Sequence, residues 1–405
     1  MKLGIFREEN DVFWMTFSLL LLGFVFCGHE NFAISEYGIP MVALLAIGLV
    51  KYIFIKEKIL NFYNIVFIIM LCCLLFNFLI RDSNFNSGFF DTYLIYFILG
   101  FLVSSISITK RQLLIIECSY IFSATTLSLW IFLFPQIHFS GRISTSFLGG
   151  PIFEFNYLAF YLIAASILAI FILISKKNNK VSKFFFIIAA FINGLGAFFT
   201  GSRSGLYALV VFFLLLCLTY FIKRKNLGRL LRYSVIGLTS GLLFIIISQS
   251  ILGTDISNRL FSSLDDQSNA KRVYNWKCAW ETIKKNPILG YGISTSPVAI
   301  KNTLGVYTSA HNSFLDFWIN HGVIPFFILL CLYFKMLKEL LKKRKIEHFS
   351  FLVAMLFAEN LVLLNISMTF WCIIYFSIKE IQLDSETTYI IKISPSRKEM
   401  IECCR

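Results

Sequence analysis

Charged residues are scarce in this sequence. Only 15% of its 405 residues are Asp, Glu, Lys or Arg, while 57% are hydrophobic and 17% are aromatic. Soluble globular domains carry about 25% charged residues. A soluble fold would leave much of this apolar surface in contact with water, which is unfavourable. The composition therefore predicts a polytopic membrane protein.

The motifs of many metal- and nucleotide-dependent enzymes are also absent. The sequence has no CxxC, HxxxH or HExxH, no Cys/His pair at zinc spacing, and no P-loop, GxGxxG or GxSxG. We therefore expect neither a metal nor another cofactor. The formal net charge is +14, but no basic patch interleaved with stacking aromatic residues lies in a polar segment. We therefore expect no nucleic-acid partner.

Long apolar runs account for most of the chain. A helix of about 20 such residues crosses the hydrocarbon core of a bilayer. Because the runs are continuous, helices are favoured over the alternating strands of a barrel. The sequence predicts an all-α fold with about 12 transmembrane helices. The predicted spans lie near residues 12–28, 38–55, 62–80, 90–108, 112–134, 154–175, 184–201, 204–222, 234–252, 323–341, 349–364 and 367–382.

Basic residues are distributed unevenly among the connections between these spans. Most of the 37 Lys and Arg residues lie in alternate connections and in the tail. The short connections on the other side carry only Arg81, Arg142 and Arg203. Since Lys and Arg favour cytoplasmic loops, both termini are predicted to be cytoplasmic. Residues 349–382 are interpreted as two crossings, because a single crossing would place the basic tail outside.

One long segment, residues 253–322, is too polar to lie in a membrane, and the alternation places it outside as a large loop. Its one cysteine, Cys278, excludes an internal disulfide. The predicted organisation is therefore nine spans in residues 1–252, the loop in 253–322, three spans in 323–382 and a cytoplasmic tail in 383–405.

Two of the external arginines are candidates for function. Arg203 lies in the run Thr200–Gly205, between two apolar helices and close to the membrane surface. Its planar guanidinium group can either grip a phosphate or diphosphate head group, or simply reach to lipid phosphates. Arg142 lies in a loop before Glu154. It can either contact a substrate or pair with Glu154, and pairing is the favoured interpretation.

Residues 268–285 of the large loop are predicted to form an amphipathic helix. Arg272 borders its apolar face and should point along the helix edge. A basic helix with two tryptophans can lie in the membrane interface or pack over the bundle as a lid, and the lid is favoured. The predicted apolar face consists of Val273, Trp276, Trp280 and Ile283.

A turn and a histidine follow this helix. Pro287 is expected to end the helix, and Gly290 and Gly292 to turn the chain sharply. His311 lies at the approach to the next span and is followed by Asn312. An isolated histidine is more often a hydrogen-bonded surface residue than a catalyst. The residues alone therefore leave both interpretations of His311 open.

The order and spacing of these residues resemble the O-antigen polymerase/ligase superfamily of bacterial envelope glycan enzymes. The resemblance covers about residues 140–345. The matching motifs, in chain order, are Arg142 with Asn156, the Gly-Ser-Arg-Ser-Gly run around Arg203, Arg272-x-x-x-Trp276, Asn286-Pro287 with Gly290-x-Gly292, His311-Asn312 and Gly322.

This resemblance implies a GT-C-like membrane glycosyltransferase that needs no metal. It would transfer a glycan from undecaprenyl diphosphate to an acceptor sugar at the periplasmic face of the bacterial inner membrane. Arg203 and Arg272 then match the arginines that hold the diphosphate. His311 matches the histidine near the reacting centre, which either takes the acceptor proton or orients the acceptor. The candidate substrate-binding residues are Arg142, Asn156, Trp276 and Asn312.

The resemblance leaves the acceptor open. A polymerase joins the glycan to another lipid-linked repeat unit, whereas a ligase moves it to lipid A–core. Polymerase is favoured because polymerases are the more numerous group. A flippase or other transporter is a further alternative, but it should carry charged residues along the midplane. The main candidates there are Glu117 and Glu359, and the sequence places no basic residue in the middle of a predicted span to pair with them. Expected partners are the lipid-linked oligosaccharide, membrane lipid and, as a candidate, a chain-length regulator protein.

Overall fold

The computed structural model describes residues 11–23, 34–54, 61–80, 87–137, 143–145, 154–175, 180–222, 228, 267–292, 296–359 and 367–393. The predicted span at 234–252, the start of the large loop, Arg81 and Arg142 lie outside these residues. The elements are α1 (Asp11–Leu22), α2 (Ile34–Phe54), α3 (Phe62–Ile80), α4 (Ser87–Ser105), α5 (Lys110–Leu133), β1 (Gln136–Ile137), β2 (Ile143–Ser144), α6 (Phe155–Ser175), α7 (Lys180–Phe199), α8 (Arg203–Ile222), α11 (Gln267–Lys285), α12 (Ser296–Leu304), α13 (Ser313–His321), α14 (Val323–Lys342), α15 (Ile346–Glu359) and α16 (Met368–Ile393).

Most of these helices have the composition of membrane spans. Among the described residues, α3, α5, α6 and α7 are long and apolar enough to cross a bilayer. Shorter apolar helices lie within α1, α2, α4, α8 and α15. The structure therefore agrees with an all-α membrane protein, and the number of about 12 spans stays a prediction. The antiparallel pair of β1 and β2 is a small addition that the sequence did not indicate.

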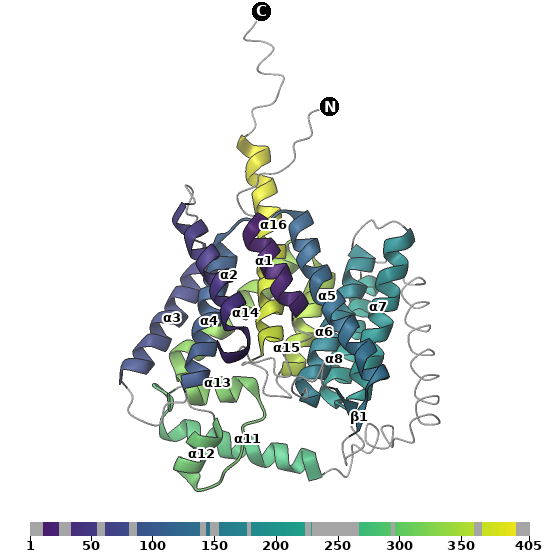
Figure 1. Cartoon of the computed structure of the whole chain (residues 1–405). Coiled ribbons are helices and arrows are strands. Elements are labelled where there is room, and N and C mark those ends of the chain that lie inside the picture. The colour runs from purple at the N-terminus through teal and green to yellow at the C-terminus, as the bar shows by residue number, and fades with distance from the viewer. Residues whose placement is uncertain are drawn as a thin grey trace, which may run out of the picture.

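The long helices lie side by side in one bundle, as Figure 1 shows. The start of α1 and the end of α16 lie at one end, which we call the terminal end. The short helices α11, α12 and α13 lie at the other, which we call the loop end. At each end, a hydrogen bond joins parts of the chain that are distant in the sequence. Trp14 Nε1 donates to the carbonyl of Ser107 at the terminal end (2.9 Å). Asn77 Nδ2 donates to the carbonyl of His321 at the loop end (3.3 Å).

The buried core is rich in aromatic rings around α16. Trp371 is fully buried and stacks on Tyr96 of α4, with ring centroids 5.7 Å apart. One helical turn later, the hydroxyl of Tyr375 donates to the carbonyl of Tyr96 (2.6 Å). The second contact satisfies a polar group that would otherwise be costly to bury. It therefore fixes how α16 is placed against α4.

Side-chain hydrogen bonds also join helices within the apolar part of the bundle. Asn193 of α7 is completely buried. Its amide nitrogen donates to Thr125 Oγ1 (2.9 Å) and its amide oxygen accepts from Ser128 Oγ (3.0 Å). Both partners lie on α5, so Asn193 connects the two helices by two hydrogen bonds. Such contacts specify helix pairing where lipid tails provide no hydrophobic driving force.

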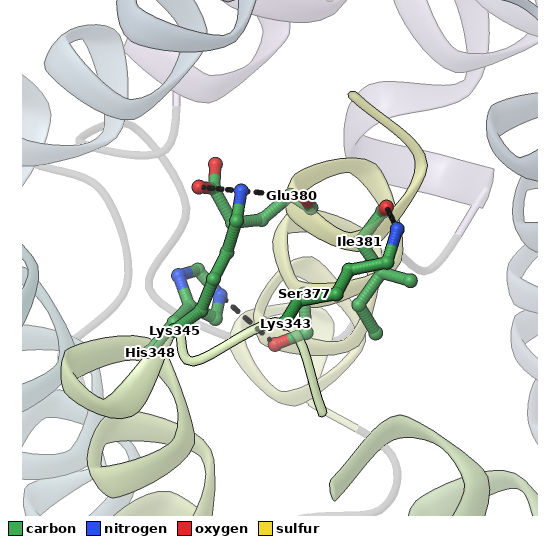
Figure 2. A network of polar contacts seen from close by, with 6 residues as sticks. All are labelled: Lys343, Lys345, His348, Ser377, Glu380 and Ile381. Carbon is green, nitrogen blue, oxygen red and sulfur yellow. Dashed lines mark hydrogen bonds and ion pairs between the residues drawn. The ribbon is translucent and has the colours of Figure 1, made fainter. Parts of the chain in front are cut away.

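A network of polar contacts holds the turn between α14 and α15 against α16, as Figure 2 shows. Lys345 Nζ lies 2.6 Å from Glu380 Oε1 and also donates to the carbonyl of Glu380 (3.0 Å). Lys343 donates to the carbonyl of Ile381. His348 Nε2 and Ser377 Oγ are 3.1 Å apart. On α16, the network involves Ser377, Glu380 and Ile381, just before residue 382, where the sequence predicts the end of the last span. Helix α16 itself continues to Ile393. A helix need not end where the membrane ends.

Candidate active site

A tight turn at the loop end positions Arg203. Thr200 Oγ1 donates to the carbonyl of Ala197 (2.7 Å) and accepts from the backbone N–H of Ser202 (3.2 Å). Gly201 has φ +63°, a conformation that glycine adopts without steric cost. The chain thus reverses directly between α7 and α8. Arg203 is the first residue of α8 and is half-buried.

Asn156 joins this turn from α6. Its amide oxygen accepts from Ser202 Oγ (3.2 Å), and Ser202 Oγ lies 3.0 Å from Ser204 Oγ. The carboxylate of Glu154 accepts from the backbone N–H of Asn156 (2.7 Å) and from that of Tyr157 (3.0 Å). Glu154 therefore caps the amino end of α6. The structure brings Asn156 and the Arg203 turn together.

The sequence did not indicate the contribution of Ser202 and Glu154. A serine beside a glycine is typical of an ordinary turn. The partner of Ser202, Asn156, lies 46 residues earlier in the chain, so the local sequence does not indicate the contact. The predicted pairing of Arg142 with Glu154 lies outside the described residues. Both carboxylate oxygens of Glu154 accept hydrogen bonds from the start of α6. Oε2 accepts from the two backbone N–H groups, and Oε1 accepts from Asn156 Nδ2 (3.0 Å).

The predicted apolar face of α11 is wrong in part. Helix α11 covers the range in which a helix is predicted, and Ile283 is buried as expected. However, Val273 and Trp280 are 48% and 44% exposed. The buried side instead carries smaller residues, because these allow close packing on α12 and α13. Its members are Asn275, Cys278, Ala279, Thr282 and Ile283.

Asn275 shows why a polar residue occupies that buried side. Its exposed fraction is 1%, and its amide oxygen accepts from Thr308 Oγ1 (2.8 Å). This bond ties α11 to the segment that leads into α13. Trp276 lies at the rim, and its Nε1 donates to the carbonyl of His311 (3.5 Å). The structure therefore brings together Trp276 and His311, which are both candidate residues of the active site.

His311 has an unusual backbone conformation. Its φ is +45°, in the left-handed region that costs an L-residue about 1–2 kcal/mol. Its N–H donates to Ser309 Oγ (3.3 Å), and its carbonyl accepts from Trp276. These contacts, with the start of α13 at Ser313, hold the strained residue in place. The imidazole is left at the surface of the protein, where a reactant can reach it.

Three effects lower the pKa of His311 below its ordinary value. The largest is partial removal of the imidazole from water by the surrounding protein, although the residue as a whole remains exposed. The positive charges of Arg272 and then Lys271 lower it further. Both desolvation and like charge disfavour the protonated ring. His311 is therefore neutral at pH 7 and able to accept a proton or a hydrogen bond.

Asn312 has a structural role that the sequence did not predict. It is the N-cap of α13, and its Oδ1 accepts from the backbone N–H of Leu315 (3.0 Å). Asparagine is a preferred residue at this position. Its amide oxygen is thus occupied in starting the helix. The placement still fixes where α13 begins, directly after His311.

The turn after α11 contacts the start of α14 through backbone atoms. As expected, α11 ends at Lys285 and Gly290 turns the chain, with φ +65°. The N–H of Val323 donates to the carbonyls of Pro287 (3.0 Å) and Ile288 (3.1 Å). Gly322, with φ +82°, leaves no space for a side chain, because a Cβ would lie 2.1 Å from the carbonyl oxygen of Ile288.

The candidate residues thus form two groups at the loop end. Arg203 and Asn156 lie where α8 and α6 begin, and Arg272, Trp276 and His311 lie where α11 meets α13. Figure 1 shows α11 running across the same end of the bundle. Such an arrangement presents positive charge and an imidazole of lowered pKa at one end of the bundle, which suits an anionic ligand. Within the described residues, no group of three His, Cys, Asp or Glu side chains could hold a metal ion.

Comparison with known proteins supports the resemblance. Residues 188–330 match the family model described as O-antigen ligase. This range includes Arg203, Arg272 and His311. A protein of Rickettsia felis, described as "Putative polysaccharide ligase", is 28% identical over 114 residues. The match covers 25% of this chain and 28% of that protein's length.

Both matches support the O-antigen polymerase/ligase superfamily and a role in surface polysaccharide biosynthesis. Arg142 and Asn156 precede the matched range. The matches do not distinguish polymerase from ligase, and ligase is supported about as well as the favoured polymerase.

We predict that Gly322→Ala prevents correct folding of the loop end. The new Cβ would overlap the carbonyl oxygen of Ile288 at 2.1 Å and also occupy an unfavourable φ of +82°. Gly305→Ala is the matched control, because its φ is +75° and no atom lies within 4 Å of a Cβ there. It should lose only about 1 kcal/mol. Thermal unfolding in detergent measures both, and equal losses would contradict the backbone overlap.

Proposed function

We propose that the protein is a metal-independent, GT-C-like membrane glycosyltransferase. It transfers a glycan from undecaprenyl diphosphate to a sugar hydroxyl at the periplasmic face of the bacterial inner membrane. The observation that carries the proposal is the neutral His311 beside the charge of Arg272 at the loop end, where Arg203 also begins α8. The cytoplasmic termini follow from the distribution of Lys and Arg.

The arginines suit the departure of a lipid diphosphate. When the bond from the sugar to the diphosphate breaks, negative charge grows on the diphosphate oxygens. Fixed guanidinium groups stabilise that charge most where water is scarce. Arg203 is half-buried at a helix start, and backbone N–H groups at such an end also favour anions. We assign diphosphate binding to Arg203 and Arg272, with Arg142 and Asn156 as further substrate contacts.

His311 suits the acceptor side of the reaction. The acceptor hydroxyl loses its proton as it bonds to the anomeric carbon, and a neutral imidazole can accept that proton. It can also orient the hydroxyl by a hydrogen bond without taking the proton. Trp276, whose indole holds the His311 carbonyl, offers an apolar ring to a sugar face. Asn312 supports the same site by fixing the start of α13.

The acceptor defines two candidate functions. A polymerase uses the sugar of another lipid-linked repeat unit, and a ligase uses lipid A–core. The matching family and the relative are described as ligases, and these matches support the two functions about equally. The greater number of polymerases in the superfamily favours polymerase. A polymerase would also have a chain-length regulator protein as a candidate partner.

We expect Arg203→Ala, Arg272→Gln and His311→Ala to reduce glycan transfer by about 100-fold or more each, as losses of transition-state contacts do. The assay is transfer by purified protein in proteoliposomes supplied with a lipid-diphosphate repeat unit. Lys277→Gln is the control, because Lys277 is an exposed residue of α11 that does not contribute to the pKa of His311. If all three variants kept full activity while folding normally, this site assignment would be wrong.

The pH dependence of transfer should report His311. Its pKa is lowered, so activity should remain constant as pH falls from 8 to about 6.5 and should decline only below that value. Lys271→Gln removes one positive charge and raises the pKa, so the decline should begin at a higher pH. Activity at pH 8 should be unchanged. A profile that Lys271→Gln leaves unmoved would argue against proton transfer at His311.

The acceptor can be identified from a deletion strain. Loss of a polymerase should leave single repeat units attached to the core, because the ligase still acts. Loss of a ligase should leave long chains on the lipid carrier. Gel analysis of lipopolysaccharide and of extracted carrier lipids separates these outcomes. Unchanged surface glycan together with unchanged carrier lipids would contradict both functions, and accumulation on the cytoplasmic face would indicate a flippase.

A further inference from the structure

An exposed apolar surface lies at the loop end. Ile288 and Leu289, at the tip of the turn after α11, are 61% and 40% exposed. Ile324 and Phe327, at the start of α14, are 55% and 54% exposed. In contact with water, such a cluster of large apolar side chains would be unfavourable. It therefore marks a contact surface. We call these four residues the apolar rim.

Hydrogen bonds place the apolar rim at the level where a membrane span ends. Helix α3 is long and apolar enough to cross a bilayer. Near its end, Asn77 donates to the carbonyl of His321 (3.3 Å). Two residues later in the chain, Val323 donates to the carbonyl of Ile288 (3.1 Å). Leu79, at the same end of α3, is 80% exposed. The rim therefore lies at the same level as the exposed apolar end of α3.

A row of aromatic rings connects the apolar rim to α11. Trp318 of α13 stacks on Phe326 of α14, with centroids 4.6 Å apart and planes at 17°. Trp280 of α11 packs edge-on against Trp318 at 5.7 Å. The indole N–H of Trp318 donates to the carbonyl of Pro287 (3.0 Å). Tryptophans concentrate at the boundary between lipid and water, because each ring is apolar with one polar group.

The remaining exposed residues of α11 agree with such a boundary. Val273 and Trp280 are exposed although both are apolar. Lys277, one helical turn after Val273, is exposed on the same face, and Lys284 on that face pairs with Glu281 (2.7 Å). Helices that lie in the membrane interface combine an apolar flank with lysines that reach lipid phosphates. The packing of α11 therefore leaves free the side that would face a bilayer.

We propose that the apolar rim and the flank of α11 carrying Trp280 dock on the interfacial layer of the bilayer. The occupant is phospholipid, because the surface lies level with the exposed apolar end of the membrane-span helix α3 and carries the exposed Lys277. The loop is then a platform fixed to the membrane rather than a freely moving lid. Docking also holds Arg272 at the depth of lipid phosphates. That consequence rests on the proposed function, whereas the docking itself does not.

Photo-crosslinking tests this docking independently of activity. A diazirine-bearing amino acid is placed singly at the positions of Ile288, Leu289 and Tyr307, and each protein is reconstituted in phosphatidylethanolamine and phosphatidylglycerol. Tyr307 is the matched control. It is 70% exposed, and its neighbour Thr308 bonds Asn275 on the buried side of α11, away from the flank that carries Trp280. Only proteins with a single symmetric size-exclusion peak are reconstituted, and either rim position is sufficient for the test.

We expect phospholipid adducts at the rim positions to exceed those at Tyr307 by about tenfold, since only an interfacial residue stays in contact with lipid. Equal labelling at all three positions would overturn the proposal, and so would protein adducts without lipid adducts at the rim. An adduct that forms only after undecaprenyl diphosphate is added would also overturn it. That result would assign the surface to the isoprenoid chain.

Discussion

The backbone contact between Gly322 and the turn at Pro287 and Ile288 is the constraint on which the loop end depends. It joins the end of α11 to the start of α14 by two hydrogen bonds from the N–H of Val323. The chain between them, with α12, α13 and His311, is thereby closed into a loop of fixed ends. The contact is possible only without a side chain at Gly322, because a Cβ would meet the carbonyl of Ile288 at 2.1 Å. A conformational requirement of one glycine thus determines the position of His311.

The position of Arg203 and Asn156 depends instead on local polar contacts. Where α7 turns into α8, the hydroxyls of Thr200 and Ser202 bond the backbone and Asn156. Unpaired polar groups at a membrane boundary are costly, so their pairing makes this turn rigid. Arg203 is consequently presented from a fixed helix end. The two groups lie at the same end of the bundle because α8 starts there and α11 crosses there, as Figure 1 shows.

The sequence was sufficient for features that depend on local pattern. The run 62–80 was predicted as a span and is α3, and the helix predicted at 268–285 is α11. Pro287 and Gly290 act as expected, because their effects on the backbone are intrinsic. The predicted apolar face of α11 is wrong for Val273 and Trp280 but right for Ile283, since close packing of Cys278 and Ala279 outweighs the periodicity of larger residues. The cap at Asn312 and the contact of Ser202 with Asn156 depend on tertiary structure, which periodicity does not contain.

The same cations can serve two steps of the proposed reaction. In the free protein, partial burial and then the charges of Arg272 and Lys271 lower the pKa of His311, which favours the neutral ring. A bound lipid diphosphate would bring negative charge close to Arg272 and offset part of that field. The pKa of His311 would then rise, because a nearby anion favours the protonated ring. The histidine would therefore become a stronger base only when the donor is in place, and would lose that strength when the diphosphate leaves. In the proposed reaction, donor binding and proton acceptance would thus be coupled through Arg272.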